Sequence, residues 1–205
     1  LKAAFELNVI DGAFTFLEFA YPLRHATGAV RYGRDPLTGP ERVDLVKLRG
    51  YGVEGSPNAN KTVEVNGFIS PINKYSQVSL NVKSPDVWID QHLRSALPSE
   101  AQEAIAYVDG LKDKDGNAIP LRAHGSFEAR VNRPYGIKKK VMPELDHNID
   151  DGDGAYTEFA YPLHNAKGQV FVRPNHVDIK NFTARNGPAH LSIDGRNSFG
   201  KNVPT

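Results

Sequence analysis

The stretch that decides the fold class is QVSLNVK, residues 77–83. Its three apolar residues alternate with polar ones, which is the period-two pattern of a strand with one buried face. The same alternation returns at residues 128–132 and 170–173. Residues that break strands and form turns are frequent between such segments, with 18 Gly and 14 Pro in the chain. The sequence therefore predicts a mainly β protein.

One helical segment interrupts the strands. Ser84-Pro85-Asp86 is typical of a helix start, and the apolar residues that follow, up to Leu97, recur at roughly helical spacing. A further helical turn or two is predicted from Ser99 to Tyr107. We expect this helix to be a short insertion between strands of a β fold.

A segment near the N-terminus is repeated about 140 residues later. DGAFT at 11–15 and EFAYPL at 18–23 return as DGAYT at 153–157 and EFAYPL at 158–163. One interpretation is a hairpin used twice as scaffold. The other is that both copies present aromatic side chains to a shared ligand, namely Phe19, Tyr21, Phe159 and Tyr161.

Composition and motifs exclude several function classes. The chain has 205 residues, 40% of them hydrophobic, and no cysteine, so we expect one large domain, or a domain with an extension, and no thiol chemistry. No apolar run is long enough to span a bilayer. The seven histidines are scattered singly, and the acidic run at 146–158 lacks the register of a calcium loop. No catalytic motif is present. We predict a non-enzymatic protein without a catalytic residue, metal site or cofactor.

The net charge of +1 conceals two opposed segments. Residues 122–140 carry six basic residues and one acidic one, a local charge of +5, whereas residues 144–158 carry six acidic residues and no Lys or Arg. The basic segment contains Tyr135, so it combines phosphate-neutralising charge with a ring on which a base could stack. The alternative interpretation is a solvated edge whose lysines discourage edge pairing.

Residues 61–182 resemble the single-stranded DNA-binding proteins of podovirus-type bacteriophages, which adopt an OB-fold. The resemblance rests on ordered pieces: KYS and the strand at 74–83, KSPD at 83–86, DGN at 115–117, the strand to Pro134-Tyr135, and the segment 168–179. It implies an OB-fold-like barrel with one helix inserted after the second strand, plus extra β-hairpins from the duplicated segment. The implied domains are an N-terminal β extension (1–60), the barrel (61–182) with an insertion at 136–167, and a C-terminal segment (183–205).

The resemblance also implies a function, which is single-stranded DNA binding in phage-type replication or recombination, in the cytoplasm of an infected host cell. Replication proteins and a homo-oligomer are the further partners expected, and a membrane is not. Basic residues would track phosphates while aromatic rings stack on bases. The expected nucleic-acid-binding residues are Tyr75, Arg122, Arg130, Arg133, Tyr135, Lys138, Lys139, Lys140, Phe171 and Arg173.

Two further hypotheses accompany this one. The acidic segment 144–158 is predicted to fold over the basic strand and compete with DNA. The alternative function is that of a structural β-subunit of a virion or filament. In such a subunit the duplicated hairpins would supply repeated lateral contacts.

Overall fold

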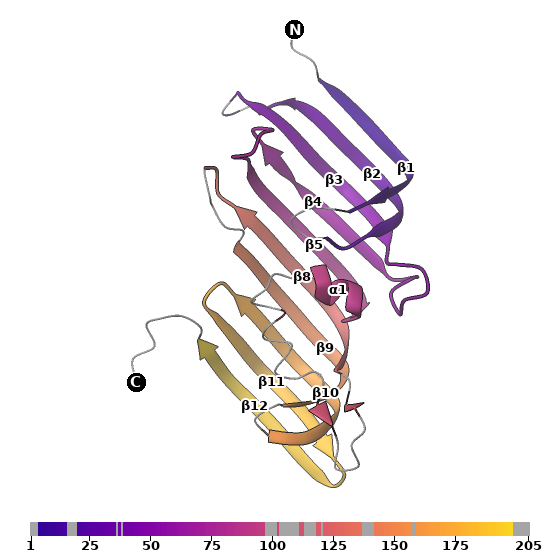
Figure 1. Cartoon of the computed structure of the whole chain (residues 1–205), viewed down its shortest axis with the longest axis vertical. Coiled ribbons are helices and arrows are strands. Elements are labelled where there is room, and N and C mark those ends of the chain that lie inside the picture. The colour runs from indigo at the N-terminus through magenta and orange to yellow at the C-terminus, as the bar shows by residue number, and fades with distance from the viewer. Residues whose placement is uncertain are drawn as a thin grey trace. The chain divides into compact units, whose positions relative to one another are not determined.

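The computed structural model describes residues 4–15, 20–35, 37, 39–96, 102, 111–112, 118–119, 121–136, 142–156 and 159–198. Within these ranges the chain forms twelve strands and one helix (Figure 1). They are β1 (Phe5–Phe14), β2 (Leu23–Arg34), β3 (Glu41–Tyr51), β4 (Thr62–Ser70), β5 (Gln77–Trp88), α1 (Gln91–Ala96), β6 (Leu111–Lys112), β7 (Ala118–Ile119), β8 (Arg122–Arg133), β9 (Met142–Tyr156), β10 (Phe159–Arg173), β11 (His176–Asn186) and β12 (Ala189–Ser198).

Ten of the strands form an open sheet in the order β1-β2-β3-β4-β5-β8-β9-β10-β11-β12, and β6 and β7 form a separate pair. The prediction of a mainly β protein is confirmed, and the three strands expected from alternation lie in β5, β8 and β10. The predicted barrel is wrong. Each long strand pairs with its neighbours in sequence, so β1 and β12 remain the two edges of the described sheet and no closure occurs.

The predicted position of the helix is also wrong, because the three strands β1–β3 of the N-terminal extension belong to the same sheet as the strands that follow. The helix follows the fifth strand. Strand β5 continues through the expected start at Ser84-Pro85-Asp86, and α1 begins only after Asp90. The carboxylate of Asp90 accepts a hydrogen bond of 2.8 Å from the backbone N–H of Leu93, which caps the helix. The second predicted helix, Ser99–Tyr107, lies outside the described residues apart from Gln102.

The chain divides into two compact units. Unit 1 comprises Leu1–Pro85 and Glu128–Glu144, and unit 2 comprises Asp86–Phe127 and Leu145–Thr205. The three domains predicted from the sequence, 1–60, 61–182 with its insertion at 136–167, and 183–205, stay a prediction.

The sheet contains two copies of a four-strand module, and the two copies pair in the same register. Strands β1–β4 correspond to β9–β12, so the duplication is longer than the hairpin found in the sequence. The duplicated segment forms the hairpins β1–β2 and β9–β10, and Pro162 lies within strand β10. Equivalent cross-strand pairs are Leu7–Val30 and His147–Val170, Val30–Leu45 and Val170–Ile179, Leu45–Gly67 and Ile179–Gly195, and Leu48–Val65 and Phe182–Ile193.

An irregularity in the ladder recurs in both copies as well. Lys47 in β3 and Asn181 in β11 have φ angles of 48° and 49°. Their backbone N–H groups donate hydrogen bonds of 2.7 Å to the side chains of Asn66 and Asp194, respectively, on the next strand. Because two copies share a rare backbone conformation and the side chain that stabilises it, the repeat is one of structure and not only of sequence.

Each unit has its own core on one face of its strands. In unit 1 the most deeply buried side chains come from the start of β2 and from β3, β4 and β5. They are Tyr21, Leu23, Leu48, Val63, Val65, Val78 and Val82, each at most 2% exposed. In unit 2 the buried set includes Val87, Leu93, Ala96, Ala123, Phe127, Ala155 and Ala184.

Candidate functional site

The sheet of unit 1 has one apolar face, which is built by rungs of residues directly opposite each other on successive strands. Cross-strand partners lie on the same face of a sheet. One rung is Leu7–Val30–Leu45–Gly67–Leu80, and the next is Phe5–Tyr32–Val43–Ile69–Val78. We call these two rungs the apolar rungs.

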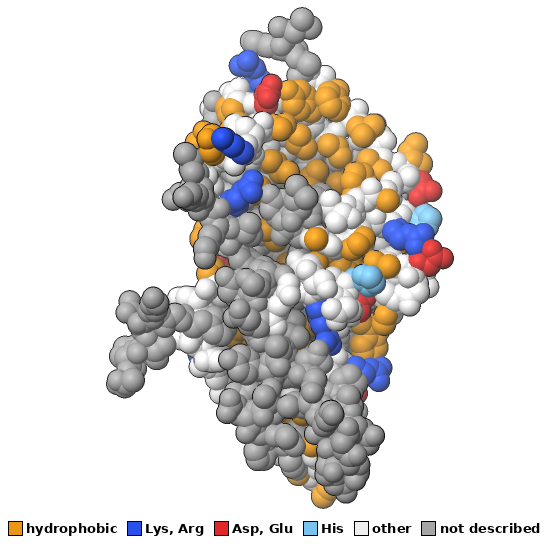
Figure 2. Space-filling model, viewed as in Figure 1, with side chains coloured by type: hydrophobic (Ala, Val, Ile, Leu, Met, Phe, Trp, Pro, Cys, Tyr) orange, Lys and Arg blue, Asp and Glu red, His pale blue; other side chains and the backbone are white. Residues whose placement is uncertain are grey.

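The apolar rungs run from open solvent into the core. At the β5 end Val78 and Leu80 are 1% and 2% exposed, whereas at the β1 end Phe5 and Leu7 are 59% and 56% exposed. Figure 2 shows hydrophobic side chains gathered on the viewed face over β1–β4. Monomeric proteins rarely leave a contiguous apolar surface open without using it.

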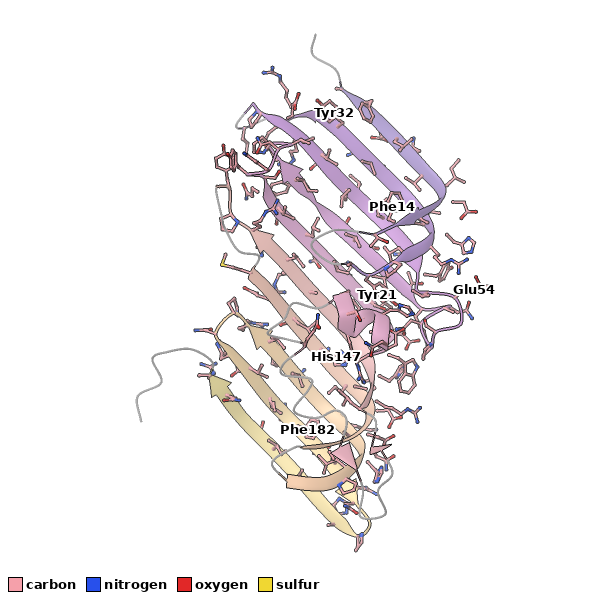
Figure 3. All side chains as sticks on the ribbon, viewed as in Figure 1. Phe14, Tyr21, Tyr32, Glu54, His147 and Phe182 are labelled. Carbon is pink, nitrogen blue, oxygen red and sulfur yellow. The ribbon has the colours of Figure 1, made fainter. Side chains whose placement is uncertain are left out.

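Tyr32 carries the polar side-chain atom of the two rungs. Its ring stacks on Phe5 with a centroid separation of 5.2 Å (Figure 3 labels Tyr32). Its hydroxyl hydrogen bonds to Glu41, and this bond raises the pKa of Tyr32 above its ordinary value. The hydroxyl is thereby engaged within the chain, so the rungs offer a surface of hydrocarbon and ring.

The opposite face of unit 1 is polar and its charges are matched. Arg31 Nε lies 2.5 Å from a Glu6 oxygen on the neighbouring strand. Glu64 lies 2.9 Å from Arg49 and 3.4 Å from Lys83, and these contacts hold the pKa of the Glu64 carboxyl below its usual value. Each of these charges therefore has a cross-strand counterion, as expected for a face that stays in water.

In unit 2 the apolar and the polar residues also lie on opposite faces of the sheet, except at one position. Val170, Val172, Val177 and Ile179 lie on the apolar face, as their alternation predicts. The exception is His147, which takes the place of Leu7 and is 4% exposed. Its Nδ1–H donates a 3.0 Å hydrogen bond to the carbonyl of Ser126, while Nε2 has no partner among the described residues. Burial lowers the pKa of His147 from 6.5 to about 4.

The arginines expected to bind phosphates have partners in the chain. Arg130 Nε lies 3.1 Å from Glu144, and Arg173 lies 2.6 Å from Asp146. Both carboxylates belong to the acidic segment, which in the structure is largely strand β9. Competition between this segment and DNA stays a prediction.

The remaining expected residues are distributed over several places. Arg122 lies over the ring of Trp88 at 5.1 Å in unit 2, and Phe171 lies beneath Arg173 and Lys180. Lys138, Lys139 and Lys140 lie outside the described residues. Among the aromatics of the repeat, Tyr21 is buried, which does not suit a ligand contact in this state; Phe19 and the side chains of Phe159 and Tyr161 lie outside the described set.

Three of the expected residues do come together, at one end of β5 and β8 in unit 1. The backbone N–H of Gly136 donates a 3.0 Å hydrogen bond to the carbonyl of Tyr75, and Arg133 donates to the carbonyl of Ser76. Tyr135 is 58% exposed, and Lys74 lies 5.1 Å from the Tyr75 ring. We call Lys74, Tyr75, Arg133 and Tyr135 the tyrosine cluster.

The exposed apolar residues of β1 and β2 were missed by the sequence interpretation. The signal was available, since Phe5, Leu7 and Val9 alternate with polar residues, as do Val30 and Tyr32.

Comparison of the chain with protein-family models, with curated proteins and with solved structures gave no match. In the described part of the chain, no helix has the length and apolar character needed to cross a membrane. Among the same residues, no three His, Asp or Glu side chains are grouped so as to hold a metal ion.

Proposed function

We propose that this chain is a binding scaffold whose apolar rungs take the hydrocarbon chain of an acyl-type ligand. The observation that carries the proposal is the exposure gradient along the rungs. Phe5 and Leu7 are more than half exposed although they continue a face that is core at β5. Burial of apolar surface stabilises a protein or complex by about 25 cal/mol for each Å², and these side chains lack that stabilisation while they remain in water.

The chemistry of the rungs favours hydrocarbon over a protein surface as occupant. Protein interfaces contain about one hydrogen bond per 100–200 Å², because the partner's backbone brings polar groups that need partners. The side chains of the rungs offer one polar atom for this purpose, the Tyr32 hydroxyl, and its proton is engaged by Glu41. An alkyl chain makes no such demand.

Chain-length dependence tests the proposal. Saturated fatty acids that lengthen by one CH₂ group would displace a fluorescent apolar dye from the protein. Burial of a CH₂ group contributes about 0.8 kcal/mol, so each step should tighten binding by up to about fourfold. An affinity that does not change with length would contradict the proposal.

A pair of variants on one strand locates the site. Leu7→Asp places a carboxylate on the apolar face and should weaken binding about tenfold or more, because the charge would have to be desolvated against the alkyl chain. Asn8→Asp places the same group on the polar face and should bind as the unaltered protein does. Equal loss in both variants would show that the rungs are not the site.

The second candidate function is single-stranded DNA binding, and the tyrosine cluster favours it. An exposed ring at Tyr135 beside Tyr75, Lys74 and Arg133 combines stacking with positive charge. This hypothesis does not depend on a barrel, and a role in phage-type replication or recombination stays a prediction.

Titration with an oligothymidine strand, followed by tyrosine fluorescence, tests this candidate. Affinity should fall as salt rises, and the double variant Tyr75→Ala/Tyr135→Ala should lose about 1 to 3 kcal/mol per stacked base. Quenching that is the same with duplex DNA, or that survives the double variant, would exclude the cluster.

A further inference from the structure

The duplicated module leaves one strand without the neighbour that its equivalent has. Strand β4 lies between β3 and β5, whereas in the described sheet the equivalent strand β12 pairs only with β11. At the other end, β1 pairs only with β2 among the described strands, whereas its equivalent β9 is flanked by two. Each edge of the sheet therefore occupies a position that is internal in the other copy.

A glycine on β12 fits a neighbouring strand that the described part of the chain does not provide. Gly67 on β4 lies directly opposite Leu80, and a Cβ at Gly67 would lie 2.8 Å from the Leu80 Cα and still closer to the Ser79 carbonyl oxygen. The approach of β5 thus requires glycine at this position. Gly195 is the equivalent residue on β12, and a Cβ there would meet nothing within 4 Å in the described part of the chain. Among the described residues, no atom occupies the space beside Gly195 that a neighbouring strand would need.

Neither edge carries proline or lysine in the segment that we consider for pairing, although each carries charged residues. Exposed edges are commonly blocked by proline or by lysine. The sequences of the two edges, FELNV at 5–9 and IDGRN at 193–197, contain neither residue. The segment 5–9 keeps the apolar–polar alternation of the internal strands, whereas in 193–197 the apolar face carries Ile193, Gly195 and then the polar Asn197.

We propose that the free edge of β12 binds β1 of a second copy of this chain as an antiparallel strand. Gly195 would lie opposite Leu7, repeating the Gly67–Leu80 pair, and Arg196 would lie opposite Glu6. In this register the rung of Leu7 in one copy continues onto the apolar face of the next, and Phe5 lies opposite Asn197.

Charge selects this register over its neighbours. Arg196 is 61% exposed and binds Asp178 at 2.5 Å, and Glu6 is 42% exposed and binds Arg31. Placing Arg196 beside Glu6 gives a rung in which the charges of Asp178, Arg196, Glu6 and Arg31 alternate in sign. A slip by two residues leaves Arg196 opposite Ala4 or Asn8, neither of which carries a charge.

The contact is head-to-tail, because β12 and β1 are different surfaces. Such an interface does not close on itself in pairs and extends into rings or linear assemblies. The inference is independent of the acyl-ligand proposal, since it concerns backbone edges and not the occupancy of the rungs.

Sedimentation velocity over a concentration series tests the contact. The unaltered chain should associate reversibly, and Gly195→Val should weaken association about tenfold or more while the monomer keeps its circular dichroism spectrum. Ser192→Val is the matched control, because it adds the same side chain to β12 outside the paired stretch 193–197, and it should associate normally.

A charge exchange identifies the two edges. Arg196→Glu alone and Glu6→Arg alone should each associate weakly, because like charges then meet across the contact. An equimolar mixture should recover association as assemblies in which the two variants alternate. The arginine introduced on β1 of one variant meets the glutamate introduced on β12 of the other, and the unaltered Arg196 and Glu6 meet at the next contact. Circular dichroism of each variant verifies that its fold is intact.

Three results would overturn the inference. The first is a chain that stays monomeric up to its solubility limit. The second is association that Gly195→Val and Ser192→Val affect equally. The third is association that survives Gly195→Val and is lost in Val30→Asp, which would place the contact on the apolar face.

Discussion

Replacing His147 by leucine should make the stability of the protein less sensitive to acid. The side chain is 4% exposed, and its folded-state pKa is about 4, below its ordinary value of 6.5. Burial is the main cause; the Ser126 carbonyl and Asp150 act in the opposite direction, and His124 adds to the lowering.

The sign follows from which state binds the proton. A histidine whose pKa is lower in the fold is protonated more readily in the unfolded chain, so the folded state loses stability as the pH falls from 6.5 toward 4. The full effect is the gap between the two pKa values multiplied by 1.36 kcal/mol, or about 3 kcal/mol. Above pH 6.5 the contribution is absent.

Urea unfolding at a series of pH values between about 4 and 7 measures the effect. The difference in free energy of unfolding between His147→Leu and the unaltered protein should shift by about 3 kcal/mol in favour of the variant over this range. The variant also loses the hydrogen bond to Ser126, but that cost does not depend on pH. His190→Leu, which removes an exposed histidine, serves as control. A difference that is constant with pH would refute the assignment of His147 as a buried neutral group.

Three further predictions concern stability. Gly67→Ala should cost about 2–4 kcal/mol in unfolding free energy, because φ is +147° and the new Cβ meets the Ser79 carbonyl; unchanged thermal stability would contradict the close approach. Glu64→Gln should cost about 1 kcal/mol at neutral pH, and this cost should vanish as the pH falls below 4.5, because the contact with Arg49 lowers the pKa of the carboxyl. A cost independent of pH would argue against that ion pair. Asp90→Ala should cost about 0.5–2 kcal/mol and reduce the small helical signal in circular dichroism, since it removes the cap of α1; an unaltered signal would contradict the cap.

The mainly β class and three of the strands could be predicted because alternation is a local signal. The strand at 77–83 needs only its own side chains to be recognised, and its apolar residues are indeed core. The helix start was misplaced because a proline after serine marks a helix only when the chain is free to turn there. At Pro85 the chain instead continues the strand to Trp88.

Topology could not be predicted from the same signals. Alternation is identical in a barrel and in an open sheet, and closure depends on whether the first and last strands meet. The repeat was recognised from DGAFT and EFAYPL, but its extent was not, because β3 and β4 share few identical residues with β11 and β12. What they share is the register and the bent positions Lys47 and Asn181.

The expected nucleic-acid-binding residues stay a prediction, but the sequence could not show what the arginines among them contact. Arg130 and Arg173 were identified by their charge, yet each has a carboxylate partner that lies more than ten residues away in sequence. A linear count of charges does not show such pairing. Whether an apolar face is covered depends on how all parts of the chain pack. The local sequence therefore does not show which part of the face stays exposed.

Strand order has a consequence for how such a protein changes over evolutionary time. Because each long strand is bonded only to strands adjacent in the order of the chain, a copied block of four inserts without breaking any existing pair beyond its two junctions. The length of the sheet is therefore a quantity that gene duplication can adjust in steps.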